Sequence, residues 1–118
     1  MLDIACEIDR SEFVLCHRDL QLPNIMIKDS KEIKFVDFEY AGFSSILWEL
    51  GNFSAELRLS QSQVQTLAQI YGNITPRDIY KGQMLSNYIW ALWSWIYHRI
   101  DLGRDYLARF DKNLKDLL

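Results

Sequence analysis

Two short stretches of the sequence decide the fold: HRDLQLPN at residues 17–24 and DFEY at residues 37–40. The first places a histidine, an aspartate and an asparagine at the spacing H-x-D-x-x-x-x-N. Taken singly, Asp19 would be an ordinary loop aspartate and Asn24 a turn residue after Pro23. The complete eight-residue pattern outweighs those interpretations and indicates a functional loop.

The residues between the two stretches have the pattern of a β-hairpin. Residues 25–28 and 32–38 alternate in polarity, and residues 29–31 would form the turn between them. Asn24 would enter this hairpin and Asp37 would leave it, so that both side chains could face one ion. Asp37 stands between two apolar residues, where an unpaired carboxylate would be costly to bury. A metal ion or another cation is the natural compensation.

The eight-residue pattern has the spacing of a kinase catalytic loop. The DFEYAG stretch at residues 37–42 resembles the D-F-E-Y segment of choline and ethanolamine kinases, a branch of the aminoglycoside phosphotransferase and kinase-like superfamily. WELGN at residues 48–52 resembles the D-[IL]-[AG]-N helix of that family, and SNYIWALWS at residues 86–94 is similar to its aromatic substrate helix. The resemblance runs from about residue 13 to residue 110 and points to the bacterial choline kinases that prime choline for cell-surface lipopolysaccharide or teichoic acid.

The resemblance implies a catalytic role for four residues. Asp19 would orient the substrate hydroxyl and take its proton. Asn24 and Asp37 would hold Mg²⁺ against the phosphates of ATP, which serves as co-substrate. Glu39 would either help to hold a second metal ion or cap its loop.

Two further residues are implied to be structural. His17 would hold the catalytic loop through hydrogen bonds. Glu49 would brace the same loop, although it stands where the family commonly has the shorter aspartate, and Arg18 stands where the family has asparagine or glycine. The longer carboxylate puts the bracing role of Glu49 in question but not the chemistry.

A substrate site for a quaternary ammonium is implied by a third group of residues. Helical spacing places Trp90 and Trp93 on one face, where packing in the core would be the ordinary interpretation; Tyr88 and Trp95, on the opposite face, are expected to be core. The resemblance matches Trp90 and Trp93 to choline-contacting tryptophans, and the aromatic faces of such residues attract cations. It also matches the substrate-side positions Tyr40, Glu56 and Tyr106.

The fold class expected is mainly α with a small β-hairpin. Residues 12–16 form a short β-rich run, and helices are predicted over residues 1–8, 61–71, 75–99 and 103–118 from capping signals and apolar periodicity. The aromatic helix carries large apolar residues on several faces and is expected to be mostly buried.

Only sixteen residues precede His17, and no glycine occurs before Gly42. Kinases of this kind carry a glycine-rich phosphate loop and a nucleotide-binding lysine upstream of the catalytic loop. We therefore expect residues 1–118 to be a single domain, the carboxy-terminal lobe of a protein kinase-like fold without the amino-terminal lobe. Alone, this lobe is expected to be inactive.

Composition excludes several classes of partner. A net charge of −3 without basic clusters gives no reason to expect nucleic acid, and the longest apolar run is too short to span a membrane. Cys6 and Cys16 lack metal-ligand spacing and are expected to be buried thiols in a reducing, cytoplasmic compartment.

Two alternative functions stay open. A related kinase acting on ethanolamine, thiamine or an aminoglycoside would share the metal site, although paired tryptophans favour choline over an aminoglycoside. The second alternative is a non-catalytic lobe that forms a homodimer through the apolar surface that a small lobe would otherwise cover.

Overall fold

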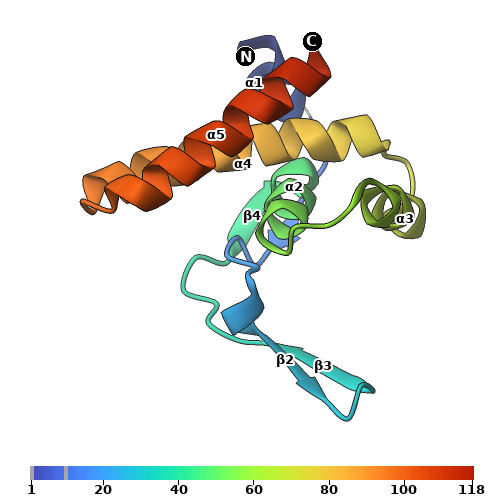
Figure 1. Cartoon of the computed structure of the whole chain (residues 1–118). Helices are drawn as coiled ribbons and strands as arrows, with labels where there is room; N and C mark the ends of the chain where they lie inside the picture. The colour runs from blue at the N-terminus through green and yellow to red at the C-terminus, as the bar shows by residue number, and fades with distance from the viewer. Residues whose placement is uncertain (1, 10) are drawn as a thin grey trace.

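The computed structural model describes residues 2–9 and 11–118 and is mainly helical with small antiparallel sheets, as predicted. The helices are α1 (Leu2–Asp9), α2 (Ile46–Glu56), α3 (Gln61–Tyr71), α4 (Pro76–Ile96) and α5 (Ile100–Leu117). The strands are β1 (Phe13–Cys16), β2 (Ile25–Lys28), β3 (Glu32–Phe35) and β4 (Gly42–Ser45), and a 3-10 turn, η1 (Leu22–Asn24), precedes β2. Figure 1 shows α4 and α5 running side by side, with α2 packed across α4 and the hairpin of β2 and β3 projecting away from the helices.

The predicted hairpin is present, with Ile25 opposite Phe35 and Lys28 opposite Glu32. Its second strand ends at Phe35 rather than at residue 38, because Asp37 has a positive φ of 63° that an extended strand cannot accommodate. A second two-stranded sheet, formed by β1 and β4, was not predicted from the sequence. This pairing places the loop after β1 beside the start of α2.

Capping explains why α3 and α4 begin where they were predicted to begin. Ser60 and Gln63 form a reciprocal capping box at α3, and Thr75 and Asp78 form another at α4, where Pro76 takes the first helical position. The predicted boundary between α4 and α5 is less accurate. Helix α4 ends at Ile96 instead of residue 99, and α5 begins at Ile100 instead of residue 103.

The core lies where α4 meets its neighbouring helices. Val64 and Ala68 on α3 pack against Ile79, and Met84 packs against Phe110 and other residues of α5. The tightest approach joins α2 to α4 at two glycines: a Cβ added to Gly82 would lie 2.0 Å from the Leu47 carbonyl oxygen, and one added to Gly51 would lie 2.2 Å from the Gly82 carbonyl carbon. The two backbones are therefore in direct contact, and side chains on α2 reach far across α4.

The expectation that α4 is mostly buried is wrong for its last turns. Ile96 is 72% exposed and Leu92 is also exposed. Trp95, expected to be a core residue, is also exposed, at 36%, although its indole lies close against Gly103 of α5. Tyr88, by contrast, packs on Phe110 as expected.

Large apolar side chains are exposed on the two small sheets. Phe43 is 74% exposed and Leu15 71%, and the hairpin exposes Ile27 and Ile33.

No helix within residues 2–9 and 11–118 is both long and apolar enough to cross a bilayer. Both thiols are free; Cys16 is buried, which raises its pKa to about 11, whereas Cys6 is exposed, contrary to expectation.

Candidate active site

The loop that follows β1 is held by a carboxylate from α2. Ser45 caps α2 by accepting a hydrogen bond from the Leu47 N–H, which places Glu49 in the first turn. The backbone N–H groups of His17 and Arg18 donate to Glu49 Oε1 and Oε2, both at 3.0 Å. Glu49 is buried, so these charge-assisted bonds lie in a poorly solvated place and fix the start of the loop relative to α2.

His17 links this loop to the segment after the hairpin. Its Nε2 lies 2.7 Å from the Val36 carbonyl oxygen, and its Nδ1 accepts from the Asp19 N–H at 3.2 Å. Because a carbonyl can only accept and an amide N–H can only donate, these partners assign the neutral tautomer with the proton on Nε2. The ring also packs on Phe38, with ring centroids 4.7 Å apart, so His17 fastens both sequence stretches together.

Asp19 is the buried carboxylate at the centre of the loop. The Asn24 amide donates to its backbone oxygen at 2.8 Å and to its Oδ2 at 3.1 Å, and Gln21 donates to its Oδ1 at 3.3 Å. Burial raises the pKa of Asp19, the negative charge of Asp37 raises it further, and the hydrogen bond from Asn24 opposes both effects. A desolvated carboxylate of raised pKa is suited to accepting a proton from a hydroxyl group.

Backbone strain marks the loop and the segment after the hairpin. Arg18, next to Asp19, has a φ of 70°, and Asp37 has a φ of 63°, both in the left-handed region that non-glycine residues seldom adopt. The Val36 N–H donates to the Asn24 carbonyl at 3.0 Å, which joins the base of the hairpin to the loop. Such strained positions cluster at functional sites, where the surrounding structure holds them in place.

The donors present suit a metal ion that arrives with phosphate. Among the described residues, no three His, Cys, Asp or Glu side chains are grouped closely enough to hold a metal by themselves. Within the same residues, Asn24 Oδ1 has no hydrogen-bond partner, and the carboxylates of Asp37 and Glu39 line one cavity. Mg²⁺ commonly binds through one or two carboxylates together with substrate phosphates and water, so this oxygen-rich set fits Mg²⁺ that a nucleotide brings.

A cavity of about 310 Å³ joins the catalytic loop to the aromatic helix. Eight of the residues singled out in the sequence, or matched through the family resemblance, line it: Asp19, Asp37, Glu39, Tyr40, Glu56, Trp90, Trp93 and Tyr106. Three further lining residues, Gln21, Arg99 and Leu102, were not predicted. The predicted residues His17, Asn24 and Glu49 do not line the cavity; their hydrogen bonds hold the loop itself, His17 and Asn24 from within it and Glu49 from α2.

One wall of the cavity is aromatic. The rings of Trp90 and Trp93 meet edge to face, with centroids 5.7 Å apart and an interplanar angle of 80°. Trp93 also packs on Tyr97 at 4.7 Å. The edge of one indole thereby supports the other, and both remain accessible from the cavity.

A half-buried carboxylate, Glu56, also lines the cavity. Tyr106 donates its hydroxyl to Glu56 Oε1 at 2.8 Å, and the Arg109 guanidinium lies 4.9 Å from the centre of the Tyr106 ring. Burial raises the pKa of Glu56, while the Tyr106 hydrogen bond and the charge of Arg109 partly oppose it. Burial and the neighbouring Glu56 charge raise the pKa of Tyr106, which keeps its hydroxyl a donor. A carboxylate and two indoles that line one cavity favour a cationic ligand.

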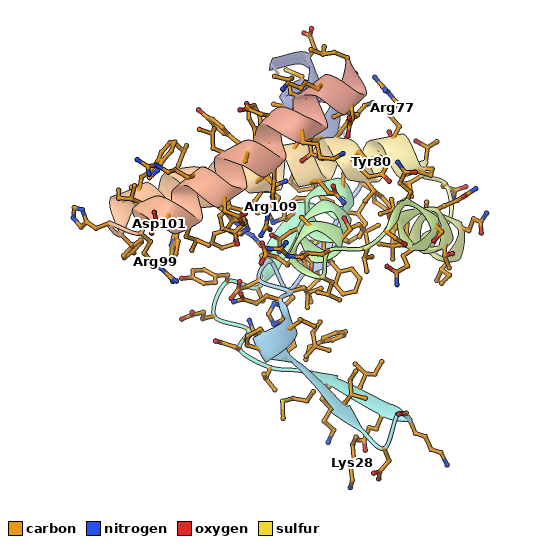
Figure 2. All side chains as sticks on the ribbon, viewed as in Figure 1. Lys28, Arg77, Tyr80, Arg99, Asp101 and Arg109 are labelled. Carbon is orange, nitrogen blue, oxygen red and sulfur yellow. The ribbon has the colours of Figure 1, made fainter. Side chains whose placement is uncertain are left out.

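A larger cavity, of about 760 Å³, lies elsewhere and has different chemistry. None of the predicted site residues lines it, and four basic residues against one acidic residue, Asp116, give it a cationic lining: Arg58, Arg77, Arg109 and Lys112. In Figure 2, Arg77 and Tyr80 of this cavity lie toward one end of the paired helices and Arg99 of the smaller cavity toward the other. The cationic lining does not suit a metal ion or a positively charged substrate.

Comparison with known proteins finds one matching family and several relatives. The family model described as choline/ethanolamine kinase matches residues 1–89. Human ethanolamine kinase 2 is 30% identical over 89% of this chain, and Protein LicA of Haemophilus influenzae is 26% identical over 85% of it. The chain spans 35% of the length of the human relative and 42% of that of LicA.

Solved structures agree on the fold. An ethanolamine kinase from Plasmodium vivax superposes with a TM-score of 0.74 at 22% identity, covering 96% of this chain and 37% of that protein. The choline kinase LicA from Streptococcus pneumoniae gives a TM-score of 0.73 at 18% identity, covering 98% of this chain and 44% of that protein. The chain therefore has the fold of part of these proteins.

Proposed function

The chain belongs to the choline/ethanolamine kinase family, and we propose that it supplies the catalytic loop and the substrate site of an enzyme that transfers a phosphoryl group from ATP to the hydroxyl of choline or a related amino alcohol. One observation carries this proposal: a single cavity is lined both by the carboxylates Asp19 and Asp37 and by the indoles of Trp90 and Trp93. A small molecule that carries a hydroxyl and a cationic group would meet both sets of residues in this cavity.

Asp19 would act on the substrate hydroxyl in this enzyme. Its carboxylate is fixed by Asn24 and Gln21, and its raised pKa favours proton acceptance. Asp37 and Asn24 Oδ1 would hold Mg²⁺, which when bound neutralises charge on the phosphates of ATP. His17 and Glu49 would keep the loop in register through the backbone contacts described above.

The substrate cation would lie against the indoles of Trp90 and Trp93 and near Glu56, which line the same cavity. A quaternary ammonium cannot donate hydrogen bonds, so aromatic faces and one carboxylate are a better match for it than a set of acceptors. The pair of Trp90 and Trp93, together with Glu56 in the same cavity, has this character, which favours choline over an aminoglycoside. Ethanolamine, which carries a primary ammonium, is the alternative substrate that the same family includes.

Trp93→Ala is expected to weaken choline binding by roughly twofold to thirtyfold, the range that one cation–π contact supports. Trp93 supports Trp90 and lines the cavity, so its removal opens the aromatic wall. Isothermal titration of choline into the chain, with ethanolamine as a second ligand, would measure the change.

Trp95→Ala provides a matched control, because Trp95 is on the same helix but does not line the cavity. Its choline affinity should equal that of the unaltered chain. Equal losses of choline affinity in the two variants would show that the indoles act through helix stability. An unchanged affinity in Trp93→Ala would show that Trp93 is a packing residue and does not contact choline.

The affinity for choline is also expected to depend on pH through Glu56. Choline keeps its charge at every pH, whereas Glu56 attracts it only when ionised. Burial raises the pKa of Glu56 above the ordinary glutamate value of about 4.3, so this carboxylate becomes neutral sooner as the pH is lowered. Choline affinity should therefore begin to fall at a pH above the range in which an ordinary glutamate titrates. Titrations across this range with Glu56→Gln as the comparison would test it: the variant should bind weakly with a flatter profile, and an identical profile would assign the dependence to another group.

We further propose that residues 1–118 form one domain, the carboxy-terminal lobe of the enzyme, and that the enzyme acts in the cytoplasm, where ATP is available. The isolated lobe is expected to have little or no kinase activity. Homodimer formation stays a prediction, which the exposed Leu15 and Phe43 side chains make physically reasonable.

A further inference from the structure

We propose that Asn52 is a positioning residue that sets the orientation of the Trp90 indole in the wall of the substrate cavity. This inference rests on the proposed function, because it concerns the same cavity, and adds a residue that does not line it. Asn52 lies in the middle of α2, whereas Trp90 lies on α4.

The contact is a hydrogen bond within the protein interior. Asn52 is 1% exposed, and its Oδ1 accepts from Trp90 Nε1 at 2.6 Å and from Ser86 Oγ at 2.8 Å. Ser86 lies one helical turn before Trp90, so both donors reach one oxygen from the same face of α4. The close contact of Gly51 with Gly82 brings the two helices near enough for this side chain to span them.

This hydrogen bond determines which way the ring faces. The indole N–H is the only polar group of a tryptophan side chain, and it is a donor alone. Turning the ring about its Cβ–Cγ bond would move Nε1 away from Asn52 and leave the partly buried N–H without its acceptor, which is unfavourable. The bonded orientation is also the one in which Trp90 meets Trp93 edge to face. By fixing the Trp90 indole, Asn52 therefore also fixes the surface against which Trp93 packs.

An amide suits this position better than the alternatives. A buried carboxylate would accept the same two hydrogen bonds but would carry an unpaired charge at 1% exposure. Leucine has a similar size and would leave both donors unpaired. A purely structural role for Asn52, as a bridge between α2 and α4, predicts that loss of either donor would have the same effect. A positioning role predicts that only the bond to Trp90 matters for the ligand.

The test compares Asn52→Leu with Ser86→Ala and Trp90→Phe. In the chain labelled with ¹⁵N, the Trp90 indole resonance should shift and lose protection from solvent exchange in Asn52→Leu but keep both in Ser86→Ala. Choline affinity, measured by calorimetric titration, should fall roughly twofold to tenfold in Asn52→Leu, in keeping with loss of one hydrogen bond. It should fall at least as far in Trp90→Phe, which loses the same bond and part of the ring that lines the cavity. It should stay within twofold of the unaltered chain in Ser86→Ala. Asn52→Leu added to Trp90→Phe should cause little further loss, because the two changes remove the same bond.

An unchanged indole resonance, or an unchanged choline affinity, in Asn52→Leu would overturn the inference, as would equal losses in Asn52→Leu and Ser86→Ala. If Asn52→Leu does not fold, Asn52→Ala decides the matter, since it removes the acceptor without filling the space of the amide and leaves the Trp90 indole itself unaltered. Failure of the unaltered chain to bind choline would count against the proposed function. The indole resonance would still show whether Asn52 holds Trp90.

Discussion

Asp19→Asn should reduce phosphoryl transfer to choline by about 10² to 10⁴-fold, the usual contribution of a general base, while choline affinity stays unchanged. The substitution keeps the size of the side chain and an oxygen that can accept from Asn24, but removes the ability to take a proton. Asp19 belongs to the loop after β1 and the indoles belong to α4, so the cation site should be unaffected. The rate would be measured in a protein that contains this chain and turns over choline.

Asp29→Asn is the matched control for this change, because Asp29 is an exposed residue at the turn of the hairpin. It removes the same charge outside the cavity and should leave the rate intact. A rate for Asp19→Asn within tenfold of the unaltered enzyme would show that Asp19 is not the base. A parallel loss of choline affinity would instead indicate that Asp19 contributes to binding.

Features set by nearby residues could be predicted from the sequence. The start of α3 follows from Ser60 and Gln63, which satisfy each other's backbone partners within one turn. The start of α4 follows in the same way from Thr75 and Asp78. The hairpin between residues 25 and 35 depends on alternation that is visible in a short window.

Features set by contacts distant in the sequence could not be predicted. β4 consists of the residues GFSS, which have little strand character and become a strand only by pairing with β1. Gly103 was expected to begin the last helix, yet it lies inside α5, where the absence of a side chain makes room for Trp95. In each case the partner lies elsewhere in the chain, and the local pattern holds no sign of it.

The same distinction applies to the cavity. Asp19 and Asp37 stand in recognisable local motifs, whereas Gln21, Arg99 and Leu102 line the cavity without a motif of their own. Asn52 was part of a quoted motif, but its contact with Trp90 depends on how α2 crosses α4. The geometry of that crossing therefore controls both the fold and the substrate site.

Gly82→Ala should lower the free energy of unfolding by about 3 kcal/mol, at the upper end of the usual cost of overpacking. The added Cβ would lie 2.0 Å from the Leu47 carbonyl oxygen and 3.1 Å from Gly51 Cα, so only separation of the two backbones could make room. Intrinsic helix propensity alone predicts the opposite sign, a gain of about 1 kcal/mol for alanine over glycine. Urea denaturation of the chain and its variant would distinguish the two results.

Gly103→Ala offers a graded comparison at a second close contact. There the added Cβ would meet the Trp95 side chain at 2.5 Å, and that half-exposed indole can move toward solvent without separating two helices. Gly103→Ala should therefore cost less stability than Gly82→Ala and leave the Trp90 indole in place. Widening the crossing at Gly82 should also draw Asn52 away from Trp90, so choline affinity should fall together with stability. A stabilised Gly82→Ala variant would mean that α2 and α4 can accommodate the added methyl group. It would also mean that their close approach does not hold Asn52 against Trp90.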